Sequence, residues 1–152
     1  MPPAPAVAPL SFSVVGRPAP QGSKTRTKFG MRDDNADTLK PWRDSVTTAA
    51  LEALAAQGRG MPFGHGVPVA VEATFYLPPT VAAQKAWDKG RTMIPVARFD
   101  VDKLARGLLD AISGIAIWDD GQVVDLLVWK RYALGRYPGA DVKVSLLVAE
   151  AA

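Results

Sequence analysis

Residues 98–125 read RFDVDKLARGLLDAISGIAIWDDGQVVD, and they carry a helical pattern followed by a strand pattern. Apolar residues recur at helical spacing over 102–113, and Gly114 is a natural stop for the predicted helix. Apolar and polar residues then alternate over 123–131, which predicts a strand. The helical spacing is set by Leu104, Leu108, Ala111 and Ile112.

Four further elements are predicted on either side of that stretch. Apolar or alternating runs predict strands over 11–15, 69–77 and 142–148. A helix is predicted over 41–57, with Pro41 in its first turn, where the missing N–H would be unpaired anyway. The order β-α-β-α-β-β predicts a single α/β (α+β) domain with one mixed β-sheet and two main helices.

The remaining segments are predicted to be irregular. Residues 1–9 are rich in Pro and Ala and are expected to form a disordered tail, so that the domain spans 10–152. Residues 17–32 are interpreted as a basic loop that either contacts phosphates or is merely solvated, and 80–98 as a long polar connection. The basic residues expected to contact the phosphates of a polyanion such as a nucleic acid are Arg17, Lys24, Arg26, Lys28, Lys85, Lys89, Arg91 and Arg98.

The composition limits the chemistry of any site. The chain has no cysteine, which excludes a disulfide framework, a thiolate zinc site and a cysteine nucleophile. Its single histidine, His65, excludes a multi-histidine metal site and is interpreted as a loop residue. Any metal must therefore be held by oxygen ligands, which favours Mg²⁺, with Mn²⁺ as a substitute. Trp118 and Trp129 are interpreted as core or interface residues.

The charge favours a polyanionic partner, since the net charge is +3 and the sequence pI is about 9.3. No run of about 18 apolar residues is present, so no membrane span is expected. The first residues lack the basic and apolar regions of a signal peptide, and we expect a cytoplasmic protein.

Two pairs of aspartates bracket the helix predicted over 102–113. Asp100 and Asp102 precede it, and Asp119 and Asp120 precede the following strand. In extended backbone the i, i+2 spacing of the first pair would point both carboxylates to one side, and the helix could fold back to bring the pairs together. Such a cluster would hold Mg²⁺ through carboxylate oxygens. The alternative is structural: a helix cap at the first pair and a turn at the second.

The same residues resemble the RusA family of crossover junction endodeoxyribonucleases, the Holliday junction resolvases. The family pattern Asp-x-Asp-Asn-Leu-x-Lys, Asp-Ala-Leu and Asp-Asp-x-Gln-Val-Val-Asp is similar to what stands at 100–106, 110–112 and 119–125. The segment FSVVGRPAPQG at 12–22 is similar to the opening of many phage-borne members.

The resemblance implies a metal-dependent homodimer that binds four-way DNA junctions and nicks two strands symmetrically, in DNA recombination and repair in a bacterial or phage-infected cell. The essential carboxylates of the family fall on Asp100, Asp102 and Asp120, with Asp119 in an assisting place. A homodimer also fits the near two-fold symmetry of the substrate.

The chain departs from the family pattern at two positions that change the charge or its shape, besides Ile112 in place of a leucine. The functional lysine falls on Arg106, whose planar guanidinium keeps its charge but does not simply replace a lysine. The usual Asn is Lys103, which could supply the ammonium from a neighbouring position. Two other functions remain open: a nuclease with the same chemistry that prefers flaps or forks, and a non-catalytic DNA-binding protein whose aspartates only cap and turn.

Overall fold

The computed structural model of the chain describes residues 7–22, 24–33 and 36–147. Its centre is a four-stranded sheet in the order β1-β6-β4-β5, formed by β1 (Leu10–Val15), β6 (Gly139–Leu146), β4 (Val69–Leu77) and β5 (Val123–Tyr132). β6 is antiparallel to both β1 and β4, whereas β4 and β5 are parallel. The predicted mixed sheet is therefore confirmed, and β1, β4 and β5 all end at the same edge.

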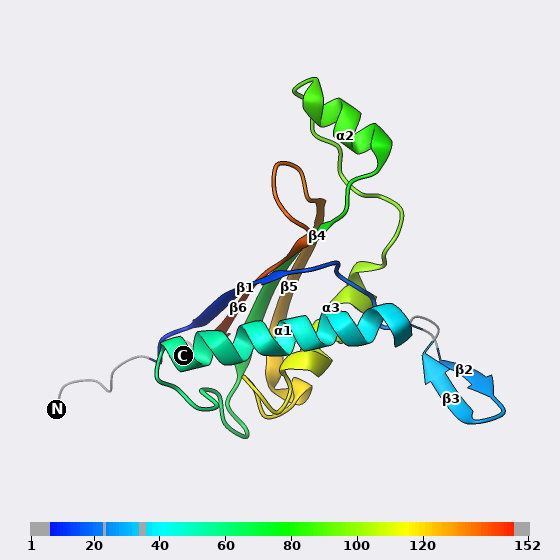
Figure 1. The fold of residues 1–152 in the computed structure, drawn as a ribbon. Coiled ribbons are helices and arrows are strands. Elements are labelled where there is room, and N and C mark those ends of the chain that lie inside the picture. Colours follow the sequence, from blue (N-terminus) through cyan, green and yellow to red (C-terminus); the bar gives the residue numbers. More distant parts are fainter. Residues whose placement is uncertain (1–6, 23, 34–35, 148–152) are drawn as a thin grey trace.

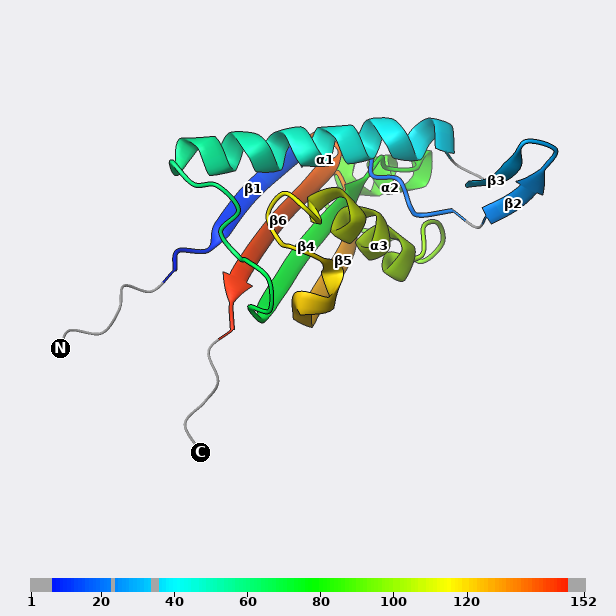
Figure 2. The same ribbon diagram turned by 90° about the horizontal axis from the view of Figure 1, so that it is seen from below.

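Two helices cover one face of the sheet, α1 (Ala36–Ala56) and α3 (Val101–Ile112) (Figures 1 and 2). α1 presents a buried residue at each fourth position, and the inward residues of β4 alternate with outward ones along the whole strand. Burial of these side chains between the helices and the sheet supplies the hydrophobic core. Its largest fully buried side chains include Trp42, Val46, Phe63, Phe75, Leu104, Leu108, Ile112 and Ile117.

One predicted helix starts earlier in the structure than expected. Helix α1 begins at Ala36, so Pro41 lies inside the helix and not in its first turn. The early turns are held down by Leu39 and Trp42, each only 2% exposed, and this packing outweighs the local cost of the proline. The tail predicted for residues 1–9 falls largely outside the described residues.

Two connections predicted to be irregular contain regular structure. The basic segment forms a hairpin of β2 (Lys24–Thr27) and β3 (Gly30–Asp33), which projects from the body near the start of α1 (Figure 1). The connection after β4 contains α2 (Val81–Asp88), capped by Thr80, whose side chain accepts a hydrogen bond from the backbone N–H of Ala83.

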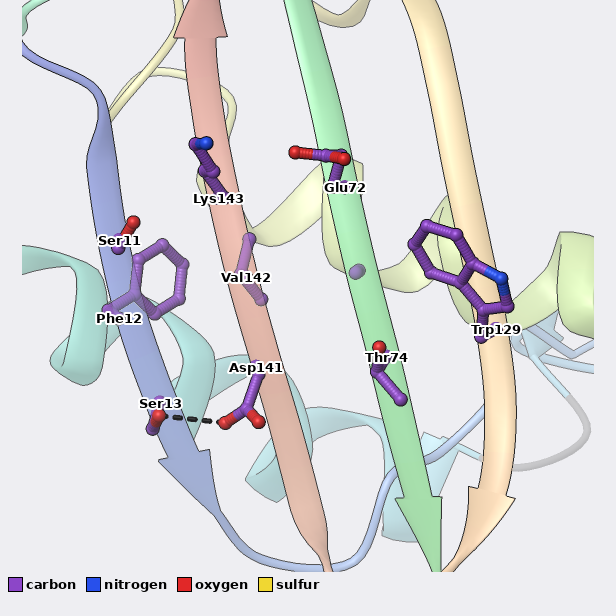
Figure 3. Close-up of a pocket in the computed structure, with 10 residues that line it drawn as sticks. Ser11, Phe12, Ser13, Glu72, Thr74, Trp129, Asp141, Val142 and Lys143 are labelled. Atoms are coloured by element: carbon purple, nitrogen blue, oxygen red, sulfur yellow. Dashed lines mark hydrogen bonds between the residues drawn. The ribbon is translucent and has the colours of Figure 1, made fainter.

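The other face of the sheet carries no helix and is largely polar (Figure 3). Ser13 of β1 donates a hydrogen bond of 2.8 Å to Asp141 of the neighbouring strand β6. Trp129 lies on this face and is 39% exposed, while Trp118 is 56% exposed in a loop. Of the two interpretations given for these tryptophans, core or interface, the core one is therefore wrong, and the interface one stays a prediction. Among the described residues, no helix is long and apolar enough to cross a membrane.

Candidate active site and nucleic-acid interface

The first aspartate pair stands at the start of α3. Asp100 is the N-cap residue, yet its side chain makes no capping hydrogen bond, and Asp102 lies in the first helical turn. The expectation of a continuous extended segment through both residues is thus wrong, because the helix begins between them. Both side chains are exposed. At this helix end the unpaired backbone N–H groups favour negative charge, and the Asp100 carboxylate remains available for a ligand.

The two basic candidates on α3 lie beside this pair. The ammonium of Lys103 is 3.7 Å from a carboxylate oxygen of Asp100, one helical turn away. Arg106 is exposed four residues after Asp102, so the two side chains share a face of the helix. Asp110 continues that face but is engaged elsewhere, because Arg43 of α1 donates to it at 2.8 Å. Lys103 is therefore the candidate whose charge already neighbours the first pair.

Lys130 is a site residue that the sequence analysis missed. It lies near the end of β5, and its ammonium donates to the backbone carbonyls of Ala97 at 3.0 Å and Phe99 at 2.9 Å. These bonds tie the segment that precedes Asp100 to the sheet edge. A lone lysine in a predicted strand gives no sequence signal for such a role.

The second pair precedes β5, in a short 3₁₀ turn over Asp120–Gln122. The Asp119 carboxylate accepts a hydrogen bond of 2.8 Å from the backbone N–H of Gly121, and Gln122 completes a capping box. The turn role that the sequence left open is thus observed for Asp119. Asp120 is exposed.

The two pairs lie at opposite ends of α3. The twelve residues of the helix span about 18 Å. β5 separates the two pairs as well. Lys130, near the end of β5, contacts the segment before Asp100, whereas Asp120 stands just before Val123, the first residue of β5. At 3.3 Å per residue, Val123 and Lys130 are roughly 23 Å apart along the strand. Among the described residues, no three acidic or histidine side chains gather closely enough to hold a metal ion. The prediction that the intervening helix brings the pairs together within one chain is therefore wrong.

The reason is the length and direction of the two elements. The turn after α3 is short: Ile117 pairs with Ser113, and the N–H of Gly114 donates to the carbonyl of Ile117 at 2.8 Å. β5 then runs back along α3 from its end toward its start. The first pair accordingly sits at the carboxyl end of β5 and the second at its amino end.

A cleft of about 740 Å³ is lined in part by the residues just before the first pair, at the edge where β1, β4 and β5 end. Two basic side chains, Arg17 and Arg98, line it together with the aromatic rings of Phe99 and Tyr132. Its other wall is formed by the first turns of α1 and by the prolines that follow β4. Ligands commonly bind outside the carboxyl ends of parallel strands, and this cleft occupies that place.

The other predicted DNA-binding residues extend from the same edge. α2 projects beyond the sheet there (Figure 1) and carries Lys85, with Lys89 as its C-cap and Arg91 just after it, all exposed. The segment that precedes the hairpin β2–β3 is joined to α3 by a hydrogen bond from the N–H of Gln21 to the carbonyl of Lys103 at 3.0 Å. Exposed Lys28 lies in the hairpin turn, whereas the side chains of Lys24 and Arg26 lie outside the described part.

Gln122 is the second residue whose role the sequence did not reveal, although it belongs to the acidic motif. It is 7% exposed, and of the described residues it is the one polar side chain in the core. Its amide oxygen accepts from the N–H groups of Trp118 at 2.6 Å and Asp119 at 3.1 Å. Its amide nitrogen donates to three carbonyls of the preceding loop, those of Phe63, Gly64 and Val67. Gln122 thus joins the loop before β4 to the acidic turn before β5.

Comparison with known proteins identifies a family and a relative. A family model described as endodeoxyribonuclease RusA matches residues 14–145, which is most of the chain. An uncharacterized protein of Bacillus subtilis (strain 168), YqaN, is 29% identical over 129 residues, covering 82% of this chain and 88% of that protein.

Proposed function

The chain belongs to the RusA endodeoxyribonuclease family, and from that premise we propose that it is a Mg²⁺-dependent enzyme that resolves four-way DNA junctions by paired symmetric nicks. Nucleases of this family depend on a divalent metal and act on branched DNA. The recombination role, the preference for Mg²⁺ over Mn²⁺ and the homodimer are part of the proposal. The observation that carries it is the placement of two aspartate pairs at opposite ends of α3.

The aspartate carboxylates suit a hard cation, but a single chain does not bring all of them to one metal site. Asp100 and Asp102 offer two exposed carboxylates, as Mg²⁺ sites built on carboxylates and substrate phosphate use. Asp120 is too far away in the same chain to join them. A two-fold axis across α3 would place the Asp120 of one copy beside the Asp100 and Asp102 of the other. We infer that the catalytic site is shared between two copies of the chain.

Each residue then has a defined task. A bound divalent metal would supply an activated water and charge neutralisation at the phosphate. The Asp carboxylates would hold the ion, with Asp119 chiefly shaping the turn that carries Asp120. Lys103 or Arg106 would place positive charge beside the developing negative charge. Lys130 would keep the backbone before Asp100 in place.

The basic edge is the surface that would bind the DNA arms. Arg17 and Arg98 line the cleft, and Lys28, Lys85, Lys89 and Arg91 extend from the same edge. Lys24 and Arg26 stand on the hairpin that projects from it. Contacts of this kind to phosphates give affinity that falls steeply with salt.

The shared site can be tested by mixing two inactive variants. Purified protein is incubated with a synthetic mobile four-way junction, with and without Mg²⁺, as wild type, Asp102→Asn and Asp120→Asn. Each variant alone should lose cleavage by orders of magnitude, while the surface control Asp44→Asn cleaves as wild type. A co-expressed pair of the two variants should recover nicking, because each mixed dimer contains one intact site.

The recovered activity has a distinctive form. About half of the dimers are mixed, and each has one working site of two, so roughly a quarter of wild-type nicking returns, in one strand only. No recovery from the mixed dimer would refute the shared site. Absence of cleavage by the wild type on junctions, flaps and forks alike would refute the nuclease itself, and cleavage of flaps and forks alone would change the substrate.

A further inference from the structure

An exposed aromatic pair stands directly before the acidic turn. Trp118 is 56% exposed, although its neighbour Ile117 is completely buried. Its ring meets that of His65 edge to face, with centroids 5.8 Å apart and planes at 84°. His65 is itself exposed, in the loop before β4. Two segments far apart in the sequence therefore present one small aromatic surface beside Asp119 and Asp120.

The backbone under this pair is held rigidly. Gln122 accepts from the N–H of Trp118 and donates to the carbonyls of Gly64 at 2.6 Å and Val67 at 2.9 Å, which flank His65 on either side. Phe63 and Ile117 also pair as a β-bridge. The amide of Gln122 thus fixes both ring-bearing segments at once. A large ring kept exposed on a fixed backbone has little freedom to lose when it binds a flat ligand.

We propose that the Trp118–His65 pair is a stacking platform for a nucleobase at the branch point of the DNA, next to the strand that is cut. Indole offers the largest aromatic face among the side chains, and bases stack on such faces whatever their sequence. The edge-on contact of His65 supports the indole ring from one side. This inference rests on the proposed function, since it assumes that branched DNA reaches the acidic turn.

The charge around the platform distinguishes it from the phosphate contacts. The predicted basic residues lie at the opposite edge of the sheet, whereas Asp119 and Asp120 adjoin the platform and, without a bound metal ion, would repel phosphates. A ligand held here must therefore be gripped through its base. In a shared site, the platform of one copy would serve the DNA held on the basic edge of the other.

Binding without cleavage tests the platform. Affinities of wild type, Trp118→Ala and Trp118→Phe are measured in EDTA for an immobile four-way junction and for a linear duplex of equal length. Loss of one stacked base corresponds to a loss of affinity of roughly five- to 150-fold. We expect Trp118→Ala to lose that factor for the junction but not for the duplex, and Trp118→Phe to keep most of the junction affinity.

The control is Trp129→Ala, which removes an exposed tryptophan from the helix-free face of the sheet. It should leave the preference for the junction unchanged. Equal junction affinity of Trp118→Ala and wild type would overturn the platform, and so would an equal loss for duplex and junction. Light scattering of Trp118→Ala provides a second check, because a change in its oligomeric state would make Trp118 an interface residue. If the wild type binds junctions through Trp118 but cuts nothing, the platform stands and the nuclease proposal fails.

Discussion

The Gln122 amide offers the sharpest test of how the acidic turn is built. Gln122→Glu keeps the oxygen that accepts from Trp118 and Asp119 but removes the nitrogen that donates to Phe63, Gly64 and Val67. A carboxylate would then face three carbonyl oxygens at a site that is 7% exposed. Each buried polar group left unpaired costs about 1–3 kcal/mol, so we expect a loss of about 3–5 kcal/mol at pH 7.

The loss should depend on pH in a defined direction. Burial among carbonyl oxygens favours the neutral acid, so the pKa of the introduced carboxyl is raised in the folded protein. Its protonated form can donate one hydrogen bond. The deficit relative to wild type should therefore be full at neutral pH and shrink as the pH falls toward the ordinary pKa of glutamic acid, about 4.3.

Urea unfolding monitored by tryptophan fluorescence at pH 7 and at pH 4.5 measures both effects. The matched control is Gln84→Glu on α2, where an exposed amide donates a single bond of 3.0 Å to Asp88. That change should stay within about 0.5 kcal/mol. A Gln122→Glu protein as stable as wild type at pH 7, or one whose deficit is the same at both pH values, would show that the amide does not hold these two loops together.

Three further predictions concern the sheet and its basic edge. Gly139→Ala should destabilise the fold by about 2 kcal/mol or more in urea unfolding, because a Cβ there would lie 1.8 Å from a carbonyl oxygen of β1; a wild-type midpoint would show that the strands part easily. Asp141→Asn should lower stability at pH 7, and in urea unfolding the difference from wild type should vanish at low pH. Burial raises the pKa of Asp141, but hydrogen bonds, led by the one from Arg136, outweigh burial and leave the pKa below the ordinary 3.8. The stabilisation by the carboxylate is therefore present above that value and is lost as the pH falls through the pKa of the folded protein. Lys85→Ala with Lys89→Ala should weaken junction binding and reduce its salt slope by about two, and an unchanged slope in a salt titration would remove α2 from the DNA interface.

The periodic elements were predictable because their signals are local. β4 was predicted over the residues that form it, since strict alternation along a half-buried strand fixes both its face and its limits. α3 was predicted within one residue at each end. The hairpin β2–β3 and helix α2 were missed because both project from the core, so no apolar periodicity marks them.

The site was predictable as a set of residue types but not as an arrangement. The motif selected Asp100, Asp102 and Asp120, and their exposure is compatible with the proposed roles. The motif could not show that a carboxylate oxygen of Asp119 accepts a capping hydrogen bond from Gly121, whereas the side chain of Asp100, the N-cap residue of α3, makes no such bond. Both outcomes depend on backbone angles at a single residue, which sequence spacing does not determine.

The error about the two pairs follows from reading closeness in sequence as closeness in space. Nineteen or so residues suffice for a helix and a turn, and such a unit ends far from where it began unless the chain then returns along itself. Here the chain does return, but as β5: the second pair stands directly before its first residue, and its last residues reach the first pair. Each α3–β5 unit thus offers half of an acidic site at either end. Two units related by a two-fold axis would complete both halves at once, giving two equivalent sites, whereas a single chain would complete none. In such an arrangement a single chain could not cut DNA, whereas a dimer would carry the two sites that a substrate with two matched strands requires. Dimerisation and catalysis would then be inseparable.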